Sequence, residues 1–291
     1  MPSIVPDFPL PETLTMPALS RSRFYLWNLG LPLLLAALVF LMFDMTRIDI
    51  AFSDLFFDPV SQTFPLDHSR LFEKITHKWA RIIPDWTGEL AVVGLLLSLV
   101  WPLCKGRGKA LLEKLRLAPL LRFTARHRRD LLFVVVAFAL CTGAIHYLKS
   151  HTSVYCPVET TQYAGKIEHK EWYQNFELLQ TAGEGRCWPG GHASGGFTML
   201  ALYFVARRYR WRYSKALLHG SLLLGFVYGT TRVLQGWHYM SHTFWAGIVV
   251  WLTCLLTALL FYGRARLEQP VLARTEPGAE QSATLIAATD R

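Results

Sequence analysis

Long apolar blocks separated by charged segments dominate the pattern along this chain. Each block comes close to the length of about 20 residues that a helix needs to cross the hydrocarbon core of a bilayer. The pattern predicts an all-α integral membrane bundle of six transmembrane helices, at Phe24–Phe43, Gly88–Cys104, Leu131–Leu148, His192–Ala206, Ser214–Thr231 and His242–Tyr262. Glycine and polar residues interrupt the fourth and fifth blocks, and neighbouring helices of a bundle can satisfy such interruptions.

Basic residues between the blocks predict the orientation of the bundle. Lysine and arginine gather in every second segment, at Arg21–Arg23, Lys105–Asp130, Arg207–Lys215 and Arg264–Arg266. Under the positive-inside rule these segments face the cytoplasm. We therefore expect two cytoplasmic termini: an N-terminal tail (residues 1–23) and a disordered C-terminal tail (residues 263–291) flank a membrane domain (residues 24–262).

Two stretches outside the spans are predicted to lie along the membrane surface. One is a helix near Leu71–Ile82, within the external segment Thr46–Pro84, and the other is the basic stretch Leu111–Arg129 at the inner surface. The external segment could shape a lipid entrance, but a simple cover over the bundle is the more economical interpretation.

The composition agrees with a membrane protein and limits the partners. The chain has 291 residues, of which 52% are hydrophobic, and a net charge of +9. The cytoplasmic flanks account for most of this charge and would meet anionic lipid headgroups, so it implies no nucleic acid and no obligate protein partner. No cleavage site of small residues follows the first block, which is therefore interpreted as a retained span.

A glycine-rich stretch around His192, from Arg186 to Gly196, is the first candidate for chemistry. Glycine allows sharp turns and close approach of the backbone to a bound group. The helix that begins here would present free N–H groups to a phosphate, and a histidine can transfer a proton at neutral pH. By itself the stretch could also be a glycine-rich entry into a membrane helix.

Further polar residues stand at the ends of spans opposite the arginine-rich segments. Taken singly, a lysine or arginine there could simply extend toward the membrane interface. Taken together, they predict a cationic site with two or three imidazoles, composed of Lys149, His192, Arg232, His238 and His242.

The spacing of these residues forms a three-part pattern. It reads Lys149-x6-Cys156-Pro157, then Pro189-Gly190-Gly191-His192, then Thr231-Arg232-x5-His238-x3-His242. This resembles the signature of the type 2 phosphatidic acid phosphatase (PAP2) superfamily: Lys-x6-Arg-Pro, Pro-Ser-Gly-His and Ser-Arg-x5-His-x3-Asp. The resemblance covers residues 131–262, including the external loop of residues 149–190.

The resemblance implies a role for each matching residue. His238 would be the nucleophile that forms a phosphohistidine, and His192 the general acid that protonates the leaving oxygen. Lys149, Arg232 and the backbone N–H groups of Gly190 and Gly191 would hold the phosphate oxygens. The superfamily needs no metal and no cofactor.

The chain departs from the superfamily pattern at four positions, and two departures affect the chemistry. Cys156 replaces a phosphate-binding arginine, for which Arg186 could substitute. His242 replaces the aspartate that orients the nucleophile, although a neutral imidazole could still fix its tautomer. Any carboxylate in that role would be a glutamate such as Glu159 or Glu184, because no aspartate occurs between Asp130 and Asp290. The other two, Gly190 and Thr231, replace serines.

Two cysteines of the external loop, Cys156 and Cys187, are candidates for a disulfide. An oxidising compartment on that side would allow them to pair. The alternative is two unrelated thiols.

These observations favour a lipid phosphatase of the bacterial inner membrane whose active site faces the periplasm or outer side. Undecaprenyl diphosphate, lipid A, phosphatidylglycerol phosphate and phosphatidate are candidate substrates. One alternative is a phosphotransferase that passes phosphate from a prenyl diphosphate to a lipid acceptor such as lipid A. Others are a haem- or metal-binding redox protein, suggested by the spacing of His238 and His242, and a binding or transport relative without catalysis.

Overall fold

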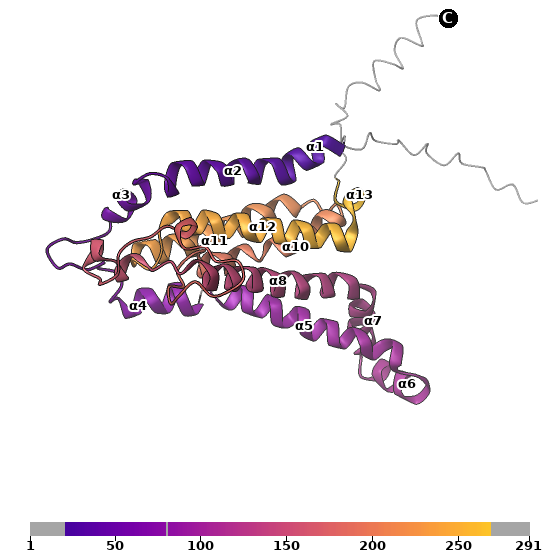
Figure 1. Cartoon of the computed structure of the whole chain (residues 1–291). Coiled ribbons are helices and arrows are strands. Elements are labelled where there is room, and N and C mark those ends of the chain that lie inside the picture. The colour runs from indigo at the N-terminus through magenta and orange to yellow at the C-terminus, as the bar shows by residue number, and fades with distance from the viewer. Residues whose placement is uncertain (1–20, 80, 269–291) are drawn as a thin grey trace, which may run out of the picture.

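The computed structural model describes residues 21–79 and 81–268, which form an all-helical protein (Figure 1). Five helical stretches are long and apolar enough to cross a membrane. They lie at Arg21–Asp44, Ile82–Leu103, Arg128–Glu159, Ser214–Leu234 and Met240–Tyr262. The first comprises α1 (Arg21–Tyr25), α2 (Leu31–Val39) and two π-helical turns, and the others contain α5 (Ile82–Leu103), α8 (Arg128–Thr152), α11 (Ser214–Leu234) and α12 (Met240–Tyr262). The lengths and hydropathy of these helices indicate a membrane protein.

The fourth predicted span is not one continuous helix. It consists of α9 (Gly191–Phe197) and α10 (Leu200–Arg208), which are separated at Thr198 and Met199. Around the break, backbone N–H groups donate to carbonyls only three residues back, as from Ala201 to Thr198, so the helix tightens locally. The Thr198 hydroxyl also donates to the Gly195 carbonyl. The count of six spans thus remains a prediction.

Small residues explain the polar interruptions in the fourth and fifth blocks. A Cβ atom placed on Gly196 would lie 2.7 Å from the Cα of Gly225. The backbones of α9 and α11 are therefore in direct contact, as small residues permit between membrane helices. This contact positions the start of α9, which carries His192, against α11, which carries Arg232.

The two ends of the bundle differ in character (Figure 1). The basic helices α6 (Gly106–Lys114), α7 (Ala118–Arg126) and α13 (Arg264–Leu267) lie at the same end as α1, so the described chain starts and finishes there. The opposite end carries α3 (Ile48–Asp54), α4 (Arg70–Glu73) and the long loop before α9. Most of the two predicted tails falls outside the described residues.

The predicted surface helices are found in altered form. The helix expected near Leu71–Ile82 is present as α4 and a π-helical continuation, Lys74–Trp79. The single helix expected at Leu111–Arg129 is wrong: a turn that includes Arg116, with a φ of 57°, separates α6 from α7. An arginine in the left-handed region cannot continue an α-helix.

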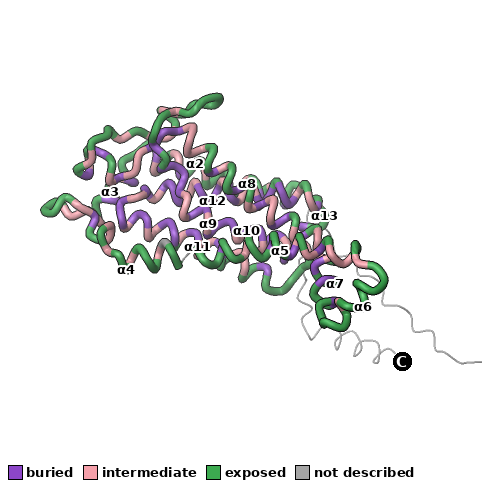
Figure 2. The backbone as a smooth tube through the Cα atoms, turned by 90° about the horizontal axis from the view of Figure 1, so that it is seen from below, coloured by how far each residue is buried: buried purple, intermediate pink, exposed green. Residues whose placement is uncertain are grey.

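The core follows the axis of the bundle, and large apolar side chains cover the outside. Phe133, Phe197 and Phe204 are fully buried, whereas Leu34 and Leu260 are more than half exposed. Buried positions face inward on every long helix and exposed ones face outward (Figure 2). A bilayer would cover this outer apolar surface.

Candidate active site

A cavity of about 960 Å³ opens between α5, α8, α9 and α11 in the half of the bundle away from the basic helices. Lys149 reaches it from the last turn of α8, and Arg232 from the last turn of α11. The remaining predicted site residues that line it are Arg186, Gly191, His192 and His238. The structure thus brings together residues from segments more than 80 positions apart in the sequence.

His238 lines the cavity, and His242 lies next to it. Their Nδ1 atoms are 3.3 Å apart, and both side chains are buried. Only one of two neutral imidazoles can carry the proton of such a contact. If Nδ1 of His238 donates to Nδ1 of His242, the Nε2 of His238 has its lone pair available for attack.

The surroundings keep His238 uncharged. Burial lowers the pKa of this imidazole well below its usual range, and the positive charge of Lys149 lowers it further. Both effects lower the pKa because both destabilise the protonated, positively charged imidazole. His238 is therefore a neutral imidazole at neutral pH, as a nucleophile must be.

Two basic side chains, Lys149 and Arg232, line the cavity. The ammonium group of Lys149 donates to the Arg186 carbonyl at 2.5 Å. Arg232 donates from Nη1 to Gln235 at 2.8 Å, and its guanidinium lies 5.4 Å from the centre of the Trp237 ring. Its Nε is buried and has no hydrogen-bond partner in the part of the chain that the structure describes. A phosphate oxygen would satisfy this donor.

Of the two glycines expected to bind phosphate through their N–H groups, Gly190 has a different role. The N–H of Gly190 donates to the carbonyl of His242 at 2.9 Å, so it is not available to a phosphate. This bond instead joins the second part of the sequence pattern to the third. At Gly191, a Cβ would lie 3.1 Å from Cε of Lys149, so glycine leaves room for that side chain.

Residues 130–266 match the model of the PAP2 superfamily. This part of the chain is a PAP2 superfamily domain. It contains all three parts of the pattern and places the chain among proteins that act on phosphate esters. No curated protein and no solved structure matches the chain.

The PAP2 domain carries a disulfide where the superfamily pattern has a phosphate-binding arginine. Cys156 and Cys187 are bonded, with Cα atoms 5.2 Å apart. The Sγ of Cys187 lies 3.3 Å from Nδ1 of His238, so the bridge packs directly against the candidate nucleophile. Arg186, the proposed substitute, lines the cavity, but its Nη1 donates to the carbonyls of Gly183 and Gly185.

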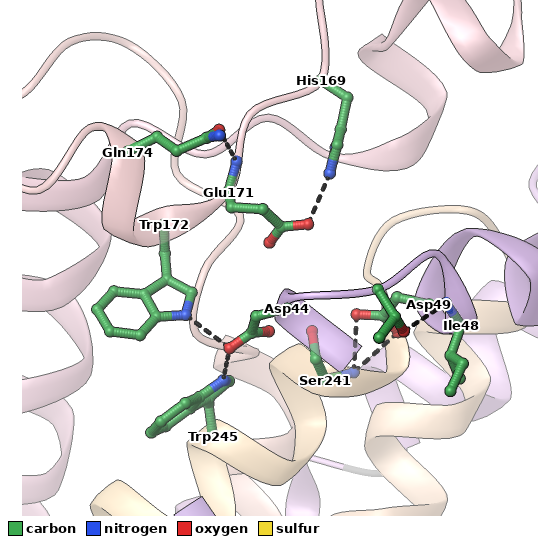
Figure 3. A network of polar contacts seen from close by, with 10 residues as sticks. Asp44, Ile48, Asp49, His169, Glu171, Trp172, Gln174, Ser241 and Trp245 are labelled. Atoms are coloured by element: carbon green, nitrogen blue, oxygen red, sulfur yellow. Dashed lines mark hydrogen bonds and ion pairs between the residues drawn. The ribbon is translucent and has the colours of Figure 1, made fainter. Parts of the chain in front are cut away.

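Two aspartates from outside the PAP2 domain contact the beginning of α12, within and just after the third part of the pattern (Figure 3). Asp49 of α3 accepts the backbone N–H of Ser241 at 3.1 and 3.3 Å. Asp44, at the end of the first span, accepts from Trp172 at 2.9 Å and from Trp245 at 2.8 Å. Both aspartates are buried at the start of α12, which carries His242.

The two glutamates that the sequence suggested as partners of the nucleophile, Glu159 and Glu184, do not lie at the beginning of α12. Glu159 accepts the backbone N–H of Cys156 at 2.7 Å and so caps a short turn of the external loop. Glu184 is exposed. The sequence pattern predicted neither Asp44 nor Asp49, because both precede the residues that resemble the superfamily. The available signal was two aspartates five residues apart, at and just after the end of an apolar span.

The group formed by Cys187, His238 and His242 does not fit a metal centre. Ligand atoms of Cys187, His238 and His242 lie within 4.8 Å of one another. Cysteine binds metals as a thiolate, however, and the sulfur of Cys187 is bonded to Cys156. Lys149 and Arg232 line the adjoining cavity and would repel a cation. The metal-binding alternative is thus not supported by the chemistry of these side chains.

Proposed function

We propose that the protein is a membrane lipid phosphatase that hydrolyses a lipid phosphate or diphosphate monoester through a phosphohistidine on His238. The observation that carries this proposal is the contact between Nδ1 of His238 and Nδ1 of His242. With the shared proton on Nδ1 of His238, this contact leaves Nε2 of a buried, neutral imidazole for attack, and His238 lines the same cavity as Lys149 and Arg232.

In the first half of the reaction, Nε2 of His238 attacks phosphorus while the bond to the lipid oxygen breaks. His192 donates a proton to the leaving oxygen, which avoids release of an unprotonated alkoxide or phosphate. Lys149 and Arg232 bind the phosphoryl oxygens, whose charge shifts as the group transfers. The products are the free lipid moiety and a phosphohistidine.

In the second half, water attacks the phosphohistidine and the P–N bond breaks. His192 has lost its proton and now accepts one from the water, so it returns to its starting state. Inorganic phosphate leaves, and His238 is again neutral. The covalent intermediate replaces one difficult displacement by two easier ones. Lys149 and Arg232 would stabilise the transition state of each step.

The cavity suits a lipid whose phosphate stands at the membrane surface. Apolar side chains of Phe138 and Ile145 line it beside the charged groups, and Gly88 of α5 lies on the same wall. Undecaprenyl diphosphate, lipid A, phosphatidylglycerol phosphate and phosphatidate share this chemistry. Because basic segments face the cytoplasm, we place the site at the periplasmic or outer side of a bacterial inner membrane.

The test is release of inorganic phosphate from these four lipids by the purified protein. His238→Ala should abolish turnover, because it removes the attacking nitrogen. His68→Ala is a matched control, since its side chain is 74% exposed, and should leave the rate unchanged. Retention of the wild-type rate by His238→Ala would rule out this nucleophile.

A phosphotransferase is the alternative within the same chemistry. The phosphohistidine would then transfer its group to a lipid hydroxyl instead of water. Phosphate release from a labelled prenyl diphosphate without an acceptor supports the hydrolase. Label that appears only in added lipid A supports the transferase.

A further inference from the structure

A second cavity, of about 1060 Å³, lies between the first span and the rest of the bundle. It is on the other side of α9 from the active-site cavity: Phe197 lines the second cavity and the next residue, Thr198, lines the first. The first span forms one wall of this groove, α11 forms the other, and Ile248 and Trp251 of α12 form the floor.

The groove is apolar over most of its length and open to the surrounding bilayer. Trp27, Leu31 and Leu35 of the first span line it and are 39–58% exposed. Leu222 and Phe226 line the opposite wall on α11. The lining extends over roughly 15–18 Å of helix, which is about the depth of one leaflet of the hydrocarbon core.

Basic side chains line only one end of the groove. Lys215 and His219 stand one turn apart on α11, near Arg23 of the first span, and this is the end where the basic helices lie. Across residues 21–79 and 81–268, neither Lys215 nor His219 forms a salt bridge. An anionic group at this end would meet positive charge, whereas the rest of the groove would accept a hydrocarbon chain.

Arg207 also borders the groove but is already engaged. It is buried and donates to the side chains of Asn28 and Tyr203. Its role is to connect α10 to the first span, so an anionic ligand would depend on Lys215 and His219 of α11 instead.

We propose that this groove binds one phospholipid with an anionic headgroup, taken from the leaflet next to the basic helices. An acyl chain would lie along Trp27, Leu31 and Phe226, and the headgroup would bind to Lys215 and His219. The bound lipid would fill the space between the first span and α11. The inference depends on insertion of the protein in a membrane but not on phosphatase chemistry.

The apolar walls alone do not distinguish one phospholipid from another, so the cations must provide the selectivity. A basic residue near an anionic lipid surface strengthens binding about fivefold. Wild-type protein should therefore retain phosphatidylglycerol over the zwitterionic phosphatidylethanolamine by about fivefold or more. Phosphatidylglycerol is a phosphodiester, so the proposed monoesterase would not consume it during the measurement.

The experiment is native mass spectrometry of the full chain in detergent with equal amounts of the two lipids. Lys215→Gln with His219→Gln should lower phosphatidylglycerol retention about fivefold and leave phosphatidylethanolamine unchanged. Lys166→Gln with Lys170→Gln, at exposed positions of the external loop and away from the basic helices, is the control and should behave like wild type. Equal retention of the two lipids by wild type, or full retention by the α11 variant, would overturn the proposal.

A second variant tests the groove itself. Leu222→Trp places a larger side chain on the half-buried wall of α11 and should remove one tightly retained phosphatidylglycerol per chain. An unchanged number of retained phosphatidylglycerol molecules per chain would also contradict the proposal. Phosphate release by the same samples is measured separately, so a failure of the proposed phosphatase would not be confused with a failure of lipid binding.

Discussion

A neutral imidazole can hold the tautomer of a neighbouring histidine but cannot balance a positive charge that forms on it. His242 occupies the place where the PAP2 pattern has an aspartate, and its Nδ1 lies 3.3 Å from that of His238. In the proposed mechanism the attacking nitrogen becomes electron-poor as the phosphoryl group arrives. At this residue, the chain therefore provides orientation of the nucleophile without charge compensation.

Substitution of His242 separates these two contributions. His242→Ala should lower kcat by about 10²–10⁴-fold, the usual value of a placed proton-handling group, because Nδ1 of His238 loses its partner. His242→Asp should remain active, since a carboxylate can accept the same hydrogen bond and adds a negative charge. Steady-state kinetics on the preferred lipid measures both effects, and melting temperatures control for folding. A His242→Ala variant with wild-type kcat would show that His242 does not position the nucleophile.

The start of α12 is the element on which the third part of the pattern depends. Its N-cap residue, Tyr239, makes no side-chain capping bond among the described residues. Asp49 provides the cap from α3 by accepting the N–H of Ser241. An element before the PAP2 domain thus stabilises the helix that carries His242.

Because the Asp49 carboxyl group is buried, its contribution to the stability of the folded protein depends on pH. Burial raises the pKa of Asp49 to about 7, from 3.8, and the nearby charges of Glu171 and Asp44 act in the same direction. The folded state therefore holds the proton more tightly than the unfolded state. The resulting stabilisation is complete below about pH 4 and is lost as the pH rises through 7.

Asp49→Asn should remove this dependence because the amide does not ionise. The melting temperature of the variant relative to wild type should rise between pH 5 and pH 8. Each unit of pKa shift corresponds to about 1.4 kcal/mol, and each kcal/mol to about 2–4 °C. Asp58→Asn is the control, since hydrogen bonds from Ser61 and Val60 lower the pKa of Asp58 and keep it ionised over this range. If the difference in melting temperature between Asp49→Asn and wild type stayed constant from pH 5 to pH 8, Asp49 would not be the group that titrates.

At the scale of the whole molecule, the external segments enclose the active-site end of the bundle. Trp237, which precedes His238, donates from its indole to Asp67 at 2.6 Å. Phe64 is 2% exposed and packs so close to Gly236 that a Cβ there would lie 2.3 Å from its ring. The external segment therefore packs over this end of the bundle, and it also lines the cavity through Thr76 and Arg81.

The disulfide stabilises this enclosure by closing a loop with a sequence separation of 31. Replacing both Cys156 and Cys187 by serine should cost about 3–4 kcal/mol and lower the melting temperature by roughly 5–15 °C. Cys104→Ser, at a free cysteine, is the control. Alkylation of both loop cysteines in intact cells without reductant would contradict the bridge.

Sequence reasoning succeeded where the determinants are local. The bilayer dictates helix length, so hydropathy predicted the five long helices. Fixed spacing singled out Lys149, His192, Arg232 and His238, which line one cavity, and His242, which contacts His238 without lining that cavity. It failed where a distant partner decides the outcome. The N–H of Gly190 is taken by His242, and the cap of α12 comes from Asp49, almost 200 positions earlier. The break at Thr198 depends on local hydrogen bonding that hydropathy does not register.

The positions of Asp44 and Asp49 bear on how the protein can be divided. The match to the superfamily begins at residue 130, and a shortened chain cut at that boundary would look complete by sequence. Such a fragment would leave the indoles of Trp172 and Trp245 without their shared acceptor and the first turn of α12 uncapped. The boundary of the family and the smallest working unit of this molecule are therefore different things.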